Sequence, residues 1–170
     1  MDGYASSEFG LHRVLSPWGE GNKSPVSNPG FGLPATAGEA TWNDRFALQS
    51  APWNAPGGVA GSDYAAAASS GTFIYDVGSS PYVFASTPAL VSDVQGWLNN
   101  PVGNFGWMLI SQSENVDFTA RRFASREDLA RAPVLEIQYT VVPKPSSVAL
   151  LTVGGFAALF YRRSRGGCNV

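Results

Sequence analysis

Side chains that commonly carry acid–base or nucleophilic chemistry are scarce in this sequence. Its 170 residues include one histidine, His12, and one cysteine, Cys168. An imidazole base would have to be His12, which has no recognisable Ser or Cys nucleophile motif as a partner, so we expect it to be structural. The thirteen acidic residues allow many carboxylate pairs of the glycosidase type, and sequence singles out none. The sequence favours a non-catalytic protein, with a polysaccharide lyase or glycosidase as the remote alternative.

Metal chemistry has few ligands to draw on. A single thiolate and a single imidazole do not supply the ligand set of a structural zinc site. Asp44 and Asp63, together with loop carbonyls, are the residues that suit Ca²⁺, although no DxDxDG-type spacing is present. We therefore expect no cofactor, with calcium at these two carboxylates left open.

Tryptophan is the residue type here that most suggests a ligand, because the face of an indole suits the apolar C–H face of a pyranose ring. Trp42 and Trp107 alternate with polar residues, and Trp97 lies on the apolar stripe of a predicted helix. We expect these three in the core. Trp18 and Trp53 lie in turn-rich segments and are the candidates for exposed, sugar-binding positions.

Three arginines form a second candidate group. Arg121, Arg122 and Arg126 have the planar, bidentate geometry that binds carboxylates, such as those of a uronate. They also neighbour Glu127 and Asp128, so a structural network of ion pairs is the alternative.

Short strands joined by long turns must position these residues. Charged residues make up only 14% of the chain, while Gly (19) and Pro (12) are plentiful. Thr87 and Pro88 begin a predicted amphipathic helix over residues 88–99. These features predict an all-β, antiparallel, jelly-roll-type sandwich with one short helix, incomplete because a jelly roll has eight strands. Alternating apolar and polar residues predict six strands, at residues 11–16, 39–47, 72–77, 106–111, 117–124 and 133–142.

The order of motifs in residues 11–142 resembles the DNRLRE domain family. The signposts run from about His12 to Tyr139 and read HRVLSPWGEG, ATWNDRF, PWNAPGG, DVQGW, NFGW, RRFASRE and PxLxIxY; Phe123, Ser125, Arg126 and Glu127 match the naming motif best. The resemblance implies a secreted jelly-roll sandwich related to carbohydrate-binding modules, with extracellular polysaccharide, acidic for some members, as its partner. The family's first strands would precede residue 11, so residues 1–10 are expected to be a disordered or truncated start.

An apolar run closes the chain. Residues 148–161 are apolar or small on every side, and would form a helix about 21 Å long. Although this is shorter than the hydrocarbon core of roughly 30 Å, a helix without a polar face favours a membrane segment over the alternative of a buried core helix. The basic tail at residues 162–170, with Arg162, Arg163 and Arg165, fits the positive-inside rule and predicts a cytoplasmic C-terminus.

The segment before this run completes a tripartite pattern that resembles the PEP-CTERM sorting signal. The motif comprises Val142, Pro143, Lys144, Pro145 and Ser146, with Lys144 standing where the family usually has Glu, and residues 143–147 form the linker. The resemblance implies recognition and cleavage by an exosortase-like enzyme in the membrane of a bacterium that makes extracellular polymers.

These patterns predict an exported protein of the cell envelope or extracellular matrix, transiently anchored through residues 148–161. The first residues, MDGYASSEFGLHRVL, lack the features of a secretory signal, so we expect the natural start to lie upstream. Residues 1–142 carry seven basic and thirteen acidic side chains, a formal charge of −6 that opposes nucleic-acid binding. Polysaccharide binding is the favoured function; a self-associating matrix protein without a sugar site is the alternative.

Overall fold

The computed structural model describes residues 5–21, 23 and 33–141. Contacts divide the chain into two units, Met1–Pro133 and Val134–Val170, and all of the regular secondary structure described here belongs to the first. The predicted sorting motif, apolar helix and basic tail, residues 142–170, lie outside the described residues. Within the described residues no helix is long and apolar enough to cross a membrane.

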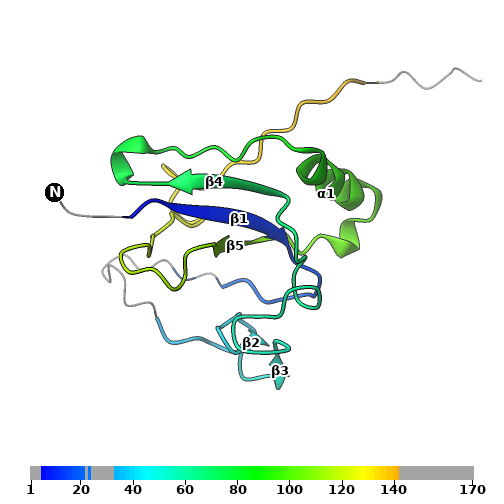
Figure 1. Ribbon diagram of the computed structural model, residues 1–170. Coiled ribbons are helices and arrows are strands. Elements are labelled where there is room, and N and C mark those ends of the chain that lie inside the picture. The colour runs from blue at the N-terminus through cyan, green and yellow to red at the C-terminus, as the bar shows by residue number, and fades with distance from the viewer. Residues whose placement is uncertain (1–4, 22, 24–32, 142–170) are drawn as a thin grey trace, which may run out of the picture. The chain divides into compact units, whose positions relative to one another are not determined.

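A three-stranded antiparallel sheet organises the first unit (Figure 1). Its central strand is β1, Ser7–Arg13, which pairs with β4, Ser70–Ile74, on one side and with β5, Trp107–Ser111, on the other. In this register Gly10 lies opposite Gly71 in β4. Both neighbours are far from β1 in the sequence, so the sheet joins the two ends of the unit.

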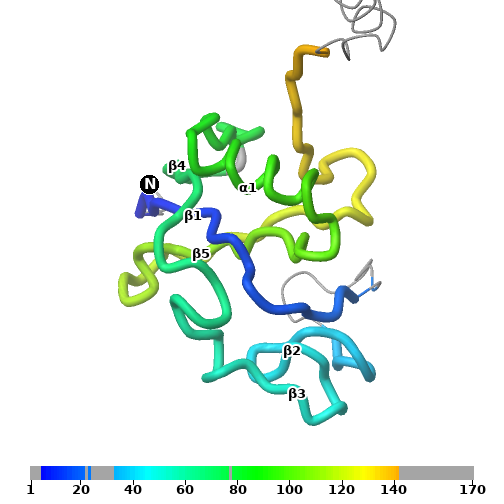
Figure 2. Tube along the Cα trace, turned by 90° about the vertical axis from the view of Figure 1, so that its right-hand side faces the viewer, coloured from blue at the N-terminus to red at the C-terminus, as the bar shows by residue number. Residues whose placement is uncertain are grey.

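A small hairpin forms a second sheet, which both views place to one side of the first (Figures 1 and 2). It consists of β2, Asp44–Phe46, and β3, Ala51–Pro52. The connecting turn places Leu48 and Ser50 at positive φ, which non-glycine residues adopt rarely. The sequence pattern predicted one long strand over residues 39–47; the structure has a three-residue strand because the chain turns back at once.

One α-helix, α1, spans Pro88–Asn99, as the sequence predicted. Thr87 is its N-cap: the side-chain oxygen accepts a hydrogen bond from the backbone N–H of Leu90 at 3.0 Å. Trp97 is the buried residue of the helix and meets Trp107 of β5 edge-to-face at 4.4 Å between ring centroids. Two 3₁₀ turns, Val77–Ser79 and Pro101–Gly103, lie between the helix and the strands.

The core of the described part is small. Phe9 of β1 packs edge-to-face against Phe123, with ring centroids 5.4 Å apart. The side chains that are both apolar and buried come from the sheet, the helix and the loops: Phe9, Val14, Ala47, Trp53, Ile74 and Trp97. An antiparallel, β-rich fold with one α-helix is thus confirmed for the described residues.

Residues 117–124 do not form the strand that their alternation predicted. Thr119 directs its hydroxyl to the carbonyl oxygens of Ser113 (2.9 Å) and Val116 (2.7 Å), and Phe118 takes a φ of 65°. These contacts fold the chain into a turn, because a hydroxyl that binds nearby carbonyls competes with a strand ladder.

The prediction of a strand over residues 133–142 is wrong for the described residues 133–141, which have no ladder partner. Leu135, Ile137 and Tyr139, which would face a core in a paired strand, are all exposed. Alternation specifies two faces, but a strand also needs a neighbouring edge to satisfy its backbone groups. This segment begins the second unit of the chain.

Candidate functional site

A hollow of about 800 Å³ in the first unit is lined by five charged side chains. Two of its lining segments are brought together from residues more than 80 positions apart in the sequence. The charged and hydroxyl-bearing side chains of the lining are Glu20, Lys23, Glu39, Thr41, Ser125, Arg126 and Glu127. Of the arginines predicted to bind a ligand, this hollow contains Arg126 alone.

Arg126 is held between two carboxylates. Its Nη1 lies 3.0 Å from Glu20 Oε2, and its Nε donates to Glu127 Oε1 at 2.9 Å. The hydrogen bond to Glu127 and the charge of Glu20 raise the pKa of Arg126. Hydrogen bonds from Ser125 and Arg126 lower the pKa of Glu127, so this pair is ionised at neutral pH. Arg126 thus pairs with its neighbour Glu127, as the alternative of an ion-pair network predicted, and also with Glu20.

A second ion pair lines the same hollow. Lys23 Nζ contacts Glu39 Oε2 and the carbonyl oxygen of Pro34, and the backbone N–H of Thr36 donates to the same carboxylate at 2.6 Å. The hydrogen bonds from Lys23 and Thr36 lower the pKa of Glu39. The hollow therefore presents two cations and three carboxylates, so its net charge is negative.

Arg121 and Arg122 lie outside this hollow. Arg121 donates from its guanidinium to the carbonyl oxygens of Ala5, Ile74, Phe118 and Ala120, tying the start of the chain to β4 and to the 113–121 turn. This is a structural role. The side chain of Arg122 is exposed. The three predicted arginines do not form one group.

The two tryptophans predicted to be exposed differ in the structure. Trp18 is partly exposed (37%), and its Nε1 donates to the carbonyl oxygen of Phe105 at 2.7 Å. Trp53 is buried (7% exposed), and its Nε1 donates to the carbonyl oxygen of Thr41 at 2.9 Å. Trp53 is therefore part of the core and has no free face for a sugar ring.

Trp42 was expected in the core, and that prediction is wrong: the residue is 67% exposed. Strand β2 begins only at Asp44, so the alternation that includes Trp42 is not that of a strand. Trp97 is buried, as predicted, and packs edge-to-face against Trp107, which is only partly buried. Trp42 is thus an exposed tryptophan that sequence reasoning missed; its local signal is its position among Thr, Asn and Asp.

The two carboxylates considered for calcium, Asp44 and Asp63, both accept hydrogen bonds from neighbouring groups. Both carboxylate oxygens of Asp63 accept hydrogen bonds, from the backbone N–H groups of Asn54 (3.0 Å) and Val59 (2.8 Å) and from the Asn54 side chain (2.8 Å). Asp44 accepts a long hydrogen bond, at 3.5 Å, from Thr41 Oγ1. Among the described residues no three His, Cys, Asp or Glu side chains come together as a metal site.

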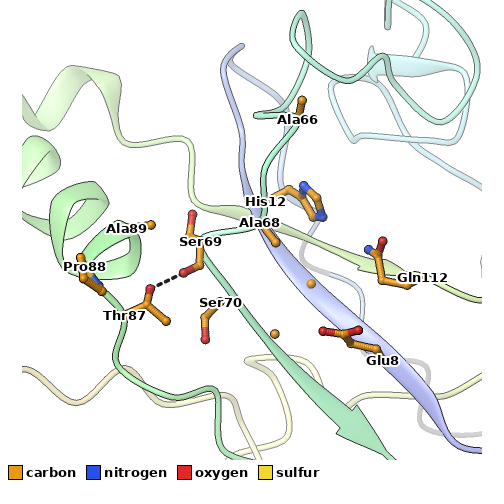
Figure 3. A pocket seen from close by; sticks show the side chains of 12 residues that line it. Glu8, His12, Ala66, Ala68, Ser69, Ser70, Thr87, Pro88, Ala89 and Gln112 are labelled. Carbon is orange, nitrogen blue, oxygen red and sulfur yellow. Dashed lines mark hydrogen bonds between the residues drawn. The ribbon is translucent and has the colours of Figure 1, made fainter.

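A second hollow, of about 620 Å³, lies over the β1–β4 ladder where Gly10 faces Gly71 (Figure 3). His12 lines it and is buried, with its Nδ1 2.8 Å from the carbonyl oxygen of Ala65. A carbonyl only accepts, so Nδ1 donates to it. Nothing in the described part of the chain hydrogen-bonds to Nε2.

The hydroxyl groups beside this hollow are committed to other partners. Ser69 Oγ donates to Asp93, and Thr87 Oγ1 donates to the carbonyl oxygen of Ser69, as the dashed line in Figure 3 marks. Asp93 also accepts from Trp107 Nε1 at 2.9 Å and pairs with Arg13 at 3.2 Å. A nucleophile activated by a base would need a hydroxyl within hydrogen-bonding reach of His12. The hydroxyls of Ser69, Ser70 and Thr87 bond to groups other than His12.

Comparison with protein-family models, with curated proteins and with solved structures found no match to this chain.

Proposed function

We propose that this chain is an exported, non-catalytic surface or matrix protein that binds polysaccharide, and that its tail delivers it to the cell envelope. The polar hollow around Arg126 carries the binding proposal. Its fixed guanidinium, ammonium and carboxylate groups supply both donors and acceptors, as the hydroxyls of a sugar require. Binding sites commonly combine concavity with a few converging polar groups.

The charge of this hollow favours neutral sugars over uronates. Arg126 and Lys23 are each already paired with carboxylates, and the three carboxylates outnumber the two cations. The body of residues 1–142 is itself acidic, at −6. Repulsion of a polyanion by both sources supports a polysaccharide whose hydroxyls, not its charges, are recognised.

The same proposal includes the domain family of the body and the type of sorting signal in the tail. The motif order between His12 and Tyr139 supports a DNRLRE-type domain with a jelly-roll sandwich fold, beyond the antiparallel sheets described above. The pattern from Val142 to Arg165 supports a PEP-CTERM signal, cleaved by an exosortase-like enzyme while residues 148–161 lie in the membrane and the C-terminus is cytoplasmic.

The test is binding of the full chain to glycans, in a detergent without a sugar headgroup so that the detergent does not compete. Cellulose, xylan, alginate and polygalacturonate are compared by pull-down and calorimetry. We expect retention by a neutral glycan with little salt dependence, and a loss of about tenfold in affinity for Arg126→Ala, since hydrogen bonds to charged groups contribute this much. Arg131→Ala removes the same charge outside the hollow and should bind like the wild type.

Failure of all four glycans to bind the wild-type chain would overturn the proposal. Concentration-dependent assembly in the same buffer, measured by analytical ultracentrifugation, would then support the self-associating matrix protein.

A further inference from the structure

An exposed indole is mounted on the loop that joins residue 39 to β2. Trp42 has the highest exposure of the five tryptophans, at 67%. Large aromatic side chains bury well, and an indole left in water forgoes that stabilisation. The contacts around Trp42 explain how the ring is held in this exposed position.

The backbone around Trp42 is fixed on both sides. The carbonyl oxygen of Trp42 accepts from the N–H of Gly57 at 2.7 Å. The preceding carbonyl, of Thr41, accepts from Trp53 Nε1 at 2.9 Å, and the following carbonyl, of Asn43, accepts from the N–H of Trp53 at 3.1 Å. Three consecutive carbonyls are thus anchored to one segment, whose own tryptophan is buried. The buried Trp53 holds the exposed Trp42 in place.

The ring of Trp42 rests on a glycine. A Cβ added to Gly57 would lie 2.3 Å from Trp42 Cη2, 2.6 Å from Cζ2 and 2.8 Å from Cζ3. Three such similar distances place that position over the face of the six-membered ring, because a position beyond the edge would be much farther from Cζ2 and Cζ3 than from Cη2. One ring face therefore lies against Gly57 near Cη2, and the 67% exposure of the residue leaves most of its remaining surface in solvent.

We propose that Trp42 is a stacking platform for one pyranose unit of a neutral, β-1,4-linked glycan such as a glucan or xylan. Such units carry equatorial hydroxyls, so their axial C–H bonds form an apolar face that matches an open indole face. A platform already fixed in its bound orientation loses little conformational entropy on binding. This inference rests on the proposed polysaccharide binding and names the sugar class and the side chain that the ring contacts.

Two variants test the indole directly. Full-length chain in a detergent without a sugar headgroup is titrated with cellohexaose and xylohexaose by calorimetry. We expect Trp42→Ala to weaken binding by about tenfold or more, as truncation of a central aromatic anchor does, and Trp42→Phe to retain part of the affinity. Leu48→Ala removes another highly exposed apolar side chain, from the β2–β3 turn, and should bind like the wild type.

A pair of glycine variants tests the mounting of the ring. Gly57 and Gly61 both have positive φ, 82° and 83°, so alanine is equally strained at either position. A methyl at Gly57 would strike the Trp42 ring, whereas one at Gly61 would meet nothing within 4 Å. We expect Gly57→Ala to weaken glycan binding and Gly61→Ala to preserve it. Thermal denaturation of both variants checks that the difference in binding does not come from a difference in stability.

The outcomes separate this inference from the function on which it rests. A wild-type chain that binds neither oligosaccharide nor the polysaccharides above overturns both. Binding that survives Trp42→Ala unchanged overturns the stacking role alone, and so does a Trp42→Ala variant that loses self-association instead of glycan affinity. Acrylamide quenching of the wild-type chain gives a check independent of variants: bound cellohexaose should shield the exposed indole, and unchanged quenching at saturation contradicts the inference.

Discussion

At the scale of single residues, buried polar groups determine the loops that surround the proposed sugar site. Asp63 is almost fully buried, and its carboxylate receives three N–H hydrogen bonds from Asn54 and Val59. The segment between these residues includes Gly57, on which the Trp42 ring lies. Asp63 thus acts on the platform indirectly, by fixing the loop beneath it.

Removing this acceptor should destabilise the fold. We expect Asp63→Ala to lower the free energy of unfolding by about 2–4 kcal/mol, because buried N–H donors lose their partner. Asp63→Asn keeps one acceptor oxygen and should lose less. Urea denaturation followed by tryptophan fluorescence measures both, and Asp117→Ala, which truncates an exposed aspartate, is the control. Equal midpoints for Asp63→Ala and the control would show that the loop does not depend on this carboxylate.

At the scale of elements, helix α1 has a capping residue with two tasks. Thr87 Oγ1 accepts from the N–H of Leu90 and donates to the carbonyl oxygen of Ser69, so one hydroxyl caps the start of the helix and joins it to the residue before β4. We expect Thr87→Ala to cost about 1–2 kcal/mol in chemical denaturation. Thr87→Ser keeps the hydroxyl and should retain most of the stability. A serine variant as unstable as the alanine variant would assign the effect to the lost methyl group.

The elements also show which sequence signals are sufficient. Helix α1 matched its predicted bounds because its cap, its first-turn proline and its apolar period are all local. Residues 134–141 kept a clean alternation and formed no strand, since alternation does not supply a partner edge. β1 begins at Ser7, earlier than predicted. The sequence pattern missed these first residues because Gly10 weakens the strand signal, although in the sheet Gly10 lies opposite Gly71.

In the candidate site, too, contacts between sequence neighbours could be predicted and contacts between distant residues could not. The pairing of Arg126 with its neighbour Glu127 was visible in the sequence. Its pairing with Glu20, more than a hundred residues away, depends on tertiary structure. The burial of Trp53 also depends on a contact that no local pattern shows, the hydrogen bond from its Nε1 to the carbonyl oxygen of Thr41.

At the scale of the whole molecule, the proposed sugar-binding head and the proposed sorting tail differ in charge. The head, residues 11–142, is acidic, whereas every charged residue after Val142 is basic. Opposite charge at the two ends suits a chain whose body is exported and whose last residues stay on the cytoplasmic side. Arg126 is paired with Glu20 and Glu127, and the backbone of Trp42 is bonded to Gly57, all within the first unit. We therefore expect that the proposed sorting signal can be changed without loss of the proposed sugar binding.

We therefore expect replacement of Arg162, Arg163 and Arg165 by serine to block processing in a host that has an exosortase-like enzyme. Without the basic cluster the apolar run lacks its cytoplasmic anchor, and intact-mass analysis should find the full C-terminus still attached. Lys144→Glu restores the residue usual between the two prolines and should be processed at least as well as the wild type. Glycan binding by the arginine variant should match the wild type. Equal cleavage of both proteins near residues 143–146 would show that the arginines are not part of the signal.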